Sequence, residues 1–138
     1  MTEAFVWNLR VYWEDTDAGG VVYHSQYLNF FERARTEWLR SRGIVQSELS
    51  GKHNLVFAIR HMDIDFLKPA RMDDELKVAV QDVTAGASRL EFQQLLTRSE
   101  GGELLCTARV TAACLEADRF RAARIPGWLK ETLGAEQQ

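Results

Sequence analysis

The segment HSQYLNFFERARTEWLRSRG, residues 24–43, gives the clearest structural signal in the chain. Its apolar residues recur at offsets of four, three and four, the spacing of one helical face; they are Tyr27, Phe31, Ala34 and Trp38, with Leu28, Phe30 and Leu39 widening the stripe. Ser25 is suited to the N-cap, and Gly43 is suited to the position just past the helix end. The segment therefore predicts an amphipathic helix whose apolar face needs a second layer.

Strand patterns flank this helix. Before it, alternate residues are apolar and predict a strand with one buried face; they are Phe5, Trp7, Leu9, Val11 and Trp13. After it, four further strands are expected, over residues 56–67, 75–84, 89–98 and 103–115. In the first of these four, the expected apolar face lies at the even positions and is interrupted by Arg60; its residues are Val56, Ala58, Met62, Ile64 and Phe66. The order predicts an α+β fold, a long central helix packed on a five-stranded antiparallel sheet.

Size and composition set further limits. The 138 residues suit a single domain over 1–138, and 46% hydrophobic with 27% charged residues is ordinary globular composition. A net charge of −3 without a basic run argues against a nucleic-acid partner. No apolar run approaches membrane-spanning length and no leader pattern is present, so a cytoplasmic protein is expected. Cys106 and Cys114 lie in one expected strand, about 26 Å apart at ~3.3 Å per residue, too far for a disulfide.

The expected sheet also carries apolar residues on its second face, namely Leu67, Val83, Leu95, Leu105 and Leu115. A single helix covers one face only. Pairing with another copy of the chain would hide what remains, so a homodimer at least is expected.

The segment EDTDAGG, residues 14–20, gathers three carboxylates between the first strand and the helix. A calcium loop is excluded because its twelfth position would be Gln26 and its fifth is Gly19, and the histidines and cysteines show no metal spacing. No nucleophile elbow or phosphate loop is present. Two interpretations stay open: a turn with a cap, or a carboxylate held for chemistry beside the helix start, where unpaired N–H groups can polarise a carbonyl.

A resemblance then becomes specific. RVYWEDTDAGGVVYHSQY, residues 10–27, followed by ERARTE at 32–37, resembles the signature of the 4-hydroxybenzoyl-CoA thioesterase superfamily, and within it the acyl-CoA thioesterases encoded with the bacterial Tol-Pal system, the YbgC type. FLKPARMDD, residues 66–74, and SRLEF, residues 88–92, also match. The resemblance thus covers nearly the whole chain.

The resemblance implies a hotdog fold, a homodimer or homotetramer with the active site between protomers, an acyl-CoA substrate and no separate cofactor. It implies that Asp17 is the catalytic carboxylate. Ala18 and His24 depart from members that favour aromatic acyl groups, so an aliphatic acyl-CoA is expected. Asp17 would either attack the thioester or activate water, and both routes stay open.

Loop residues Gly20, Tyr23 and His24 are the expected surroundings of the oxyanion, with the His24 N–H as the main donor. The imidazole of His24 has two open roles: assisting catalysis beside Asp17, or making a structural hydrogen bond at the helix start. Arg60, Lys68, Arg71 and Arg89 are expected to meet the phosphates of coenzyme A. Weaker expectations are Arg119, Arg121 and Arg124 as further cations, Glu32 as a brace for the loop, and His53 and His61 as ordinary polar residues.

Two alternatives to hydrolysis remain. The chain could instead bind acyl carrier protein or a Tol-Pal-linked envelope protein without catalysis. A hotdog dehydratase also binds acyl thioesters at a helix start, but the spacing from Asp17 to His24 does not match the paired histidine and acid of those enzymes.

Overall fold

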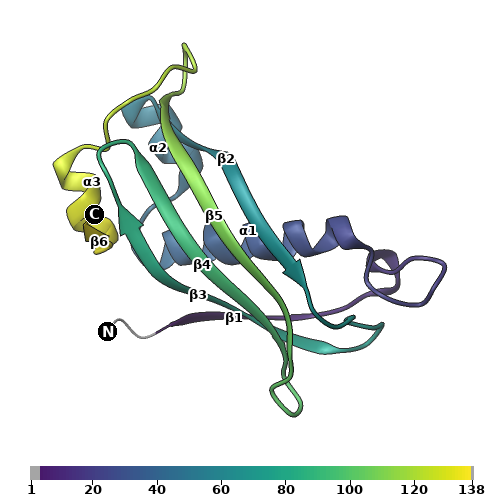
Figure 1. Cartoon of the computed structure of the whole chain (residues 1–138). Helices are drawn as coiled ribbons and strands as arrows, with labels where there is room; N and C mark the ends of the chain where they lie inside the picture. The colour runs from purple at the N-terminus through teal and green to yellow at the C-terminus, as the bar shows by residue number, and fades with distance from the viewer. Residues whose placement is uncertain (1–3, 138) are drawn as a thin grey trace.

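The structure, a computed structural model, describes residues 4–137. One long helix lies along one face of a curved sheet, and two short helices lie at the end of the molecule opposite the start of that helix (Figure 1). The strands are β1 (Phe5–Arg10), β2 (Leu55–Phe66), β3 (Glu75–Ala85), β4 (Arg89–Arg98), β5 (Leu104–Glu116) and β6 (Glu136–Gln137). The helices are α1 (His24–Ser41), α2 (Gln46–His53), α3 (Gly127–Leu133) and the 3₁₀ turn Trp13–Asp15.

The sheet order is β1-β3-β4-β5-β2, and each neighbouring pair in it is antiparallel. The expected α+β architecture with a five-stranded antiparallel sheet is thereby confirmed. The two-residue β6, which pairs parallel with β3, was not expected. β1 and β2 form the edges of the sheet, so each offers one unpaired side.

The core lies between α1 and the sheet, as the helical stripe predicts. Tyr27, Phe31, Ala34 and Trp38 are all buried, and the Trp38 ring packs edge-on against Phe92 of β4 at 5.6 Å. Val11 is fully buried and is held by backbone hydrogen bonds to Asp73 and Asp74. Leu28 is instead 41% exposed, so it does not belong to the buried stripe.

The local expectations at the start of the chain need two corrections. The first strand ends at Arg10, and Trp13 is 82% exposed in the 3₁₀ turn that follows, so it does not share the buried face. The helix is capped by Tyr23 and not by Ser25. The Tyr23 N–H donates to the Asp15 carbonyl at 2.9 Å, which holds Tyr23 extended, and the helix therefore begins at His24.

The interruption at Arg60 is a β-bulge. The register between β2 and β5 shifts between Ile59 and His61, so one extra residue enters β2. Before the bulge Phe57 packs on the core, and after it Met62 and Ile64 do, which moves the inward face from odd to even positions. The even-numbered face expected along the whole strand is wrong for its first half.

Of the five apolar residues expected to remain uncovered, two are buried, two are half-buried and one is exposed. The half-buried ones are Leu95 and Leu115. Val83 and Leu105 are buried within the single chain, so for them no second copy is needed. Leu67 is 53% exposed, and Ile59 and Phe66 on β2 are 49% exposed each. Cys106 and Cys114 are both free and buried in β5, as expected. Within residues 4–137 no helix has the length and apolar character to cross a bilayer.

Candidate active site

The acidic loop is a small, tightly bonded hairpin. Asp15 is only 8% exposed, and its Oδ2 accepts a hydrogen bond from the Tyr12 N–H at 2.8 Å. An isolated bridge joins Thr16 to Val22, and the Asp17 N–H donates to the Val21 carbonyl at 2.9 Å. Bonds from the loop's own backbone therefore fix the position of Asp17.

The carboxylate of Asp17 is exposed at the tip of this hairpin. Its Oδ1 accepts a hydrogen bond from the Gly19 N–H at 2.8 Å, so the turn interpretation is confirmed. The turn then closes at Gly20, whose φ of +78° suits glycine. Oδ2 makes no hydrogen bond with any described residue, and Asp17 lines a cleft of about 360 Å³. A turn residue thus also presents a free carboxylate oxygen to a cleft.

The cleft lies between the start of α1 and the segment after β2. Val21, Val22, His24 and Tyr27 line it together with Phe66, Leu67, Lys68 and Pro69. The Tyr27 ring packs edge-on against Phe66 at 5.3 Å, and its hydroxyl accepts a hydrogen bond from the Ala70 N–H at 3.0 Å. Burial raises the pKa of the Tyr27 hydroxyl, and the charge of Asp17 is among the smaller causes acting in the same direction. The walls are therefore mainly apolar, with Asp17 and Lys68 as charged groups.

The start of α1 supplies the cleft with hydrogen-bond donors. The Gly20 N–H donates to the Asp17 carbonyl and the Tyr23 N–H to the Asp15 carbonyl, so neither amide is available to a ligand. In the described part of the chain, the N–H groups of His24 and Ser25 meet no backbone acceptor. Of the three residues expected around an oxyanion, only His24 keeps a free amide.

The imidazole of His24 is exposed and tilts against the Tyr23 ring at 4.3 Å. Within residues 4–137 no hydrogen bond joins it to Asp17. Its imidazole makes no hydrogen bond with any other described residue either, so the structural bond expected at the helix start is not found there, and the catalytic role stays a prediction.

The four cations expected to meet coenzyme A do not cluster in one chain. Lys68 lines the cleft and pairs with Glu103 at 2.9 Å, and Arg71 is bridged to Val21 beside it. Arg60 is at the β2 bulge. Arg89 begins β4, about 30 Å at ~3.3 Å per residue from Arg98, the residue that ends this strand and contacts Pro69 of the cleft wall. Only Lys68 and Arg71 adjoin the cleft within one protomer.

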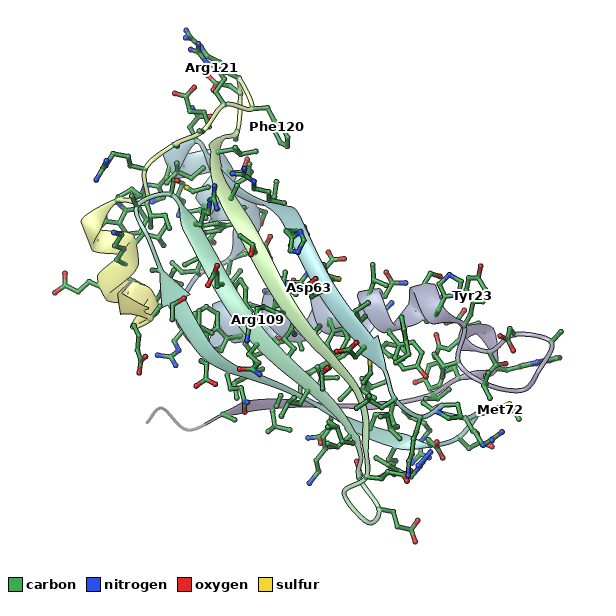
Figure 2. All side chains as sticks on the ribbon, viewed as in Figure 1. Tyr23, Asp63, Met72, Arg109, Phe120 and Arg121 are labelled. Atoms are coloured by element: carbon green, nitrogen blue, oxygen red, sulfur yellow. The ribbon has the colours of Figure 1, made fainter. Side chains whose placement is uncertain are left out.

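The weaker expectations are placed as follows. Arg121 lies in the loop after β5, at the opposite end of the molecule from Tyr23 and Met72 (Figure 2). His53 is exposed against Trp128, and exposed His61 is 3.3 Å from Asp63, both consistent with polar surface residues. Among the described residues, no three metal-binding side chains gather in one place.

Sequence reasoning missed Arg98, which holds the cleft wall in place. Its guanidinium donates to the Pro69 carbonyl at 3.1 Å, to Asp74 at 3.3 Å and to Glu103 at 2.6 Å. Because Glu103 also accepts a hydrogen bond from Lys68, this arginine is bonded to Pro69 directly and to Lys68 through Glu103. Nothing in the sequence near Arg98 indicates these partners.

Comparisons with known proteins agree with the fold and show the family. The sequence profile of the thioesterase-like superfamily matches residues 11–133. The chain is 38% identical over 130 residues to an acyl-CoA thioesterase YbgC from Haemophilus influenzae, covering 94% of each chain.

Solved structures give the same result. A 1,4-dihydroxy-2-naphthoyl-CoA thioesterase from Synechocystis superposes with a TM-score of 0.87 at 26% identity, covering 96% of each chain. A probable thioesterase from Bartonella henselae superposes with a TM-score of 0.83 at 35% identity, covering 90% of this chain and 100% of the other. The helix and sheet thus form the expected hotdog fold, and the chain belongs to the thioesterase-like superfamily.

Proposed function

We propose that the chain is an acyl-CoA thioester hydrolase in which Asp17 is the catalytic carboxylate. One observation carries the proposal: the free Oδ2 of Asp17 and the start of α1, with its unpaired N–H groups, line the same apolar cleft. The YbgC relatives, named as acyl-CoA thioesterases, support the same reaction.

The geometry suggests a division of roles. The thioester carbonyl oxygen accepts a hydrogen bond from the His24 N–H, which stabilises the negative charge that develops there. In one route Asp17 attacks the carbonyl carbon and forms an anhydride, which water then hydrolyses. In the other route water attacks the carbonyl carbon, and Asp17 takes a proton from that water. In both routes the C–S bond breaks, the thiolate leaves and is protonated, and the products are a carboxylic acid and free coenzyme A.

Lys68 and Arg71 are the cations best placed for the phosphates of coenzyme A, because they adjoin the cleft. The apolar walls formed by Val22, Phe66 and Leu67 suit an aliphatic acyl group. The exposed edge of β2 makes a homodimer, or a homotetramer built from it, the expected assembly. A cytoplasmic location suits this substrate.

The test is release of thiol from acyl-CoAs of graded chain length. Asp17→Asn keeps the shape of the side chain and removes its basicity, so turnover should fall about 10²- to 10⁴-fold, the usual contribution of a general base. Asp73→Asn is the matched control: Asp73 is an exposed aspartate that does not line the cleft, with φ of +71°, a conformation that asparagine also tolerates.

Equal activity of wild type and Asp17→Asn would contradict the proposed role of this carboxylate. Absence of turnover in wild type with every acyl-CoA would contradict hydrolysis itself. Acyl carrier protein binding without turnover would then favour the non-catalytic alternative.

A further inference from the structure

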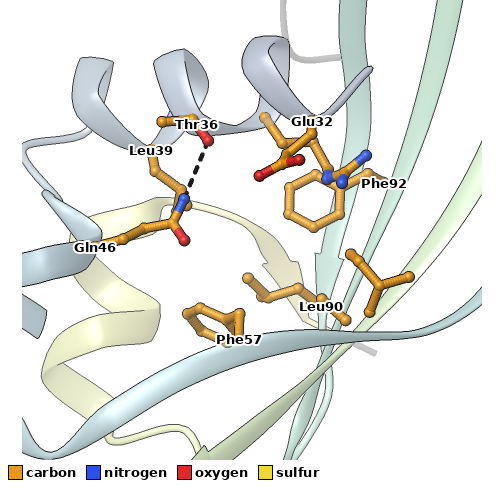
Figure 3. Close-up of a pocket in the computed structure, with 10 residues that line it drawn as sticks. Glu32, Thr36, Leu39, Gln46, Phe57, Leu90 and Phe92 are labelled. Atoms are coloured by element: carbon orange, nitrogen blue, oxygen red, sulfur yellow. Dashed lines mark hydrogen bonds between the residues drawn. The ribbon is translucent and has the colours of Figure 1, made fainter. Parts of the chain in front are cut away.

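A second cavity lies between α1 and the sheet, away from the cleft of Asp17. Its volume is about 220 Å³, and Figure 3 shows the helix on one side and Phe57, Leu90 and Phe92 around the interior. The residues that line it come from five elements: Glu32, Arg35, Thr36 and Leu39 of α1, Gln46 of α2, Phe57 and Ile59 of β2, Leu90 and Phe92 of β4, and Ala112 of β5. Arg35 lies eleven residues after His24, about 16 Å along the helix at 1.5 Å per residue.

Arg35 is the unusual residue of this cavity. Its side chain is only 7% exposed, yet no carboxylate lies within ion-pair distance of it in the described part of the chain. Its Nη1 donates to Gln94 Oε1 at 2.9 Å, and the Gln94 Nε2 donates in turn to the Phe31 carbonyl at 2.9 Å. Gln94 is fully buried, so the guanidinium is fixed in position by a neutral partner.

One edge of this guanidinium is left free. Within residues 4–137, Nε and Nη2 of Arg35 make no hydrogen bond, and neither is sealed from solvent. These two nitrogens carry parallel N–H groups, the arrangement that binds a carboxylate through two hydrogen bonds. Because Arg35 lines the cavity and is otherwise buried, the cavity is where this edge is accessible.

We propose that this cavity binds a small monocarboxylic acid, with the carboxylate on the Nε–Nη2 edge of Arg35 and the apolar body against Phe57, Leu90 and Phe92. The size fits, since a cavity of about 150 Å³ lined by apolar side chains holds benzene. A volume of about 220 Å³ therefore accommodates a ring or a short alkyl chain together with its carboxylate. The proposal does not rest on thioester hydrolysis, although the acid that such a reaction releases belongs to the same chemical class.

Two charges act on the bound acid in opposite directions. Burial lowers the pKa of Arg35 to about 10 although the charge of Glu32 opposes the shift, so the guanidinium remains cationic at neutral pH. Glu32 also lines the cavity, but it is exposed, and water screens its repulsion of a carboxylate more than it screens the attraction of the buried Arg35. A hydroxyl group would behave differently, because it would accept from Arg35 and donate to Glu32.

Titration of the methyl-labelled protein with hexanoate and benzoate, followed by NMR of Leu90 and Ala112, tests the proposal. Both acids should shift these methyl signals, and hexanol should bind at least about tenfold more weakly, as expected for the loss of a charge-assisted pair. Arg35→Met should weaken hexanoate binding by a similar factor, whereas Glu32→Gln should strengthen it roughly twofold or more. Asp17→Asn should leave binding unchanged, which separates this cavity from the cleft.

If Arg35→Met does not fold, a variant that fills the cavity tests the proposal instead. Ala112→Leu fills the cavity from β5 and leaves Arg35 and Gln94 in place, so it should abolish the methyl shifts. Hexanol binding as tightly as hexanoate would overturn the proposal, as would acid binding unchanged in Ala112→Leu. Weaker binding in Glu32→Gln would also overturn it and would indicate recognition of a hydroxyl group.

Discussion

At the residue scale, Asp15 and Asp17 are two positions apart, but the first is expected to stabilise the loop and the second to act in catalysis. Asp15 is buried and binds the Tyr12 N–H, whereas Asp17 is exposed and faces the cleft. Asp15→Ala should therefore lower the free energy of unfolding by about 1–3 kcal/mol, the cost of an orphaned buried donor. Asp17→Ala should change it by less than about 0.5 kcal/mol while abolishing turnover.

Urea denaturation of both variants, run beside the thiol-release assay, measures this difference. Equal losses of stability would mean that the Asp17 carboxylate belongs to the framework of the loop as much as Asp15 does.

Arg98 is a positioning residue, since it touches the cleft wall and not the cleft itself. Arg98→Met removes the bonds to Pro69 and Glu103, which frees the segment carrying Lys68. We expect a rise in KM for acyl-CoA of about fivefold, corresponding to about 1 kcal/mol, with a smaller change in kcat. Arg98→Lys should restore part of it, because a lysine still supplies charge.

Arg109→Met is the control for Arg98, because Arg109 is an exposed arginine on the neighbouring strand β5 (Figure 2). A fall in kcat at unchanged KM in Arg98→Met would contradict the proposal that Arg98 only positions the cleft wall.

At the element scale, two glycines isolate the effect of backbone conformation on the helices. A Cβ at Gly43 or at Gly51 would meet no atom within 4 Å, so crowding is absent at both. Gly43 lies just after the C-cap residue Arg42 of α1 with φ of +83°, whereas Gly51 lies inside α2 with no positive φ. Gly43→Ala should therefore destabilise the fold by about 1 kcal/mol, and Gly51→Ala should stabilise it by about 0.5–1 kcal/mol.

Thermal and urea unfolding of the two variants tests this pair. Changes of the same sign would show that something other than φ, such as a contact in a larger assembly, governs one of the positions.

The elements that the sequence predicts are those with strong periodicity. The apolar residues of α1 recur at helical spacing and those of the strands after it alternate, so the ends of these elements are predicted to within a few residues. α2 was missed because its segment QSELSGKH buries only Leu49, and α3 because only Leu129 and Leu133 are buried in it. Short helices of this kind are stabilised by the layer beneath them and leave little pattern of their own.

The candidate site was predictable only in part. Asp17 came from a local motif and its family resemblance, and the motif is contiguous. Arg35 reaches Gln94 across 59 residues, and Arg98 reaches Pro69 across 29, so neither partner can be read from spacing along the chain. The bulge at Arg60 could be predicted in part. The sequence shows an interruption of the apolar pattern, but the register shift appears only in the pairing of β2 with β5.

At the scale of the whole molecule, the reactivity of the two buried cysteines measures global unfolding. Burial raises the pKa of Cys106 to about 12 and that of Cys114 to about 11, so both remain protonated at pH 8. Alkylation of the native protein at pH 8 should be slow and should accelerate in proportion to the unfolded population as urea is added. Rapid labelling of either thiol without urea would show that β5 opens locally.

The same shifts give a pH dependence with a definite sign. Above about pH 9 the unfolded thiols ionise while the folded ones do not, so the folded state binds more protons. The cysteines' contribution to stability is therefore present below that pH and is lost as pH rises toward 11–12. Replacing both cysteines with alanine should reduce the slope of the free energy of unfolding against pH in this range. An unchanged slope would show that other groups cause the pH dependence.

The last prediction concerns the assembly. β2 is an edge strand of 12 residues with Ile59 half exposed on it, and a long apolar edge of this kind invites pairing with another chain. Sedimentation equilibrium should give a mass of at least twice 15.8 kDa. Ile59→Lys on β2 should shift the mass toward that of the monomer, whereas Val6→Lys, on the opposite edge strand β1 and similarly exposed, should not. A monomer at all concentrations, or a larger effect of Val6→Lys, would exclude pairing through β2, and a site shared between protomers could then not form along this edge.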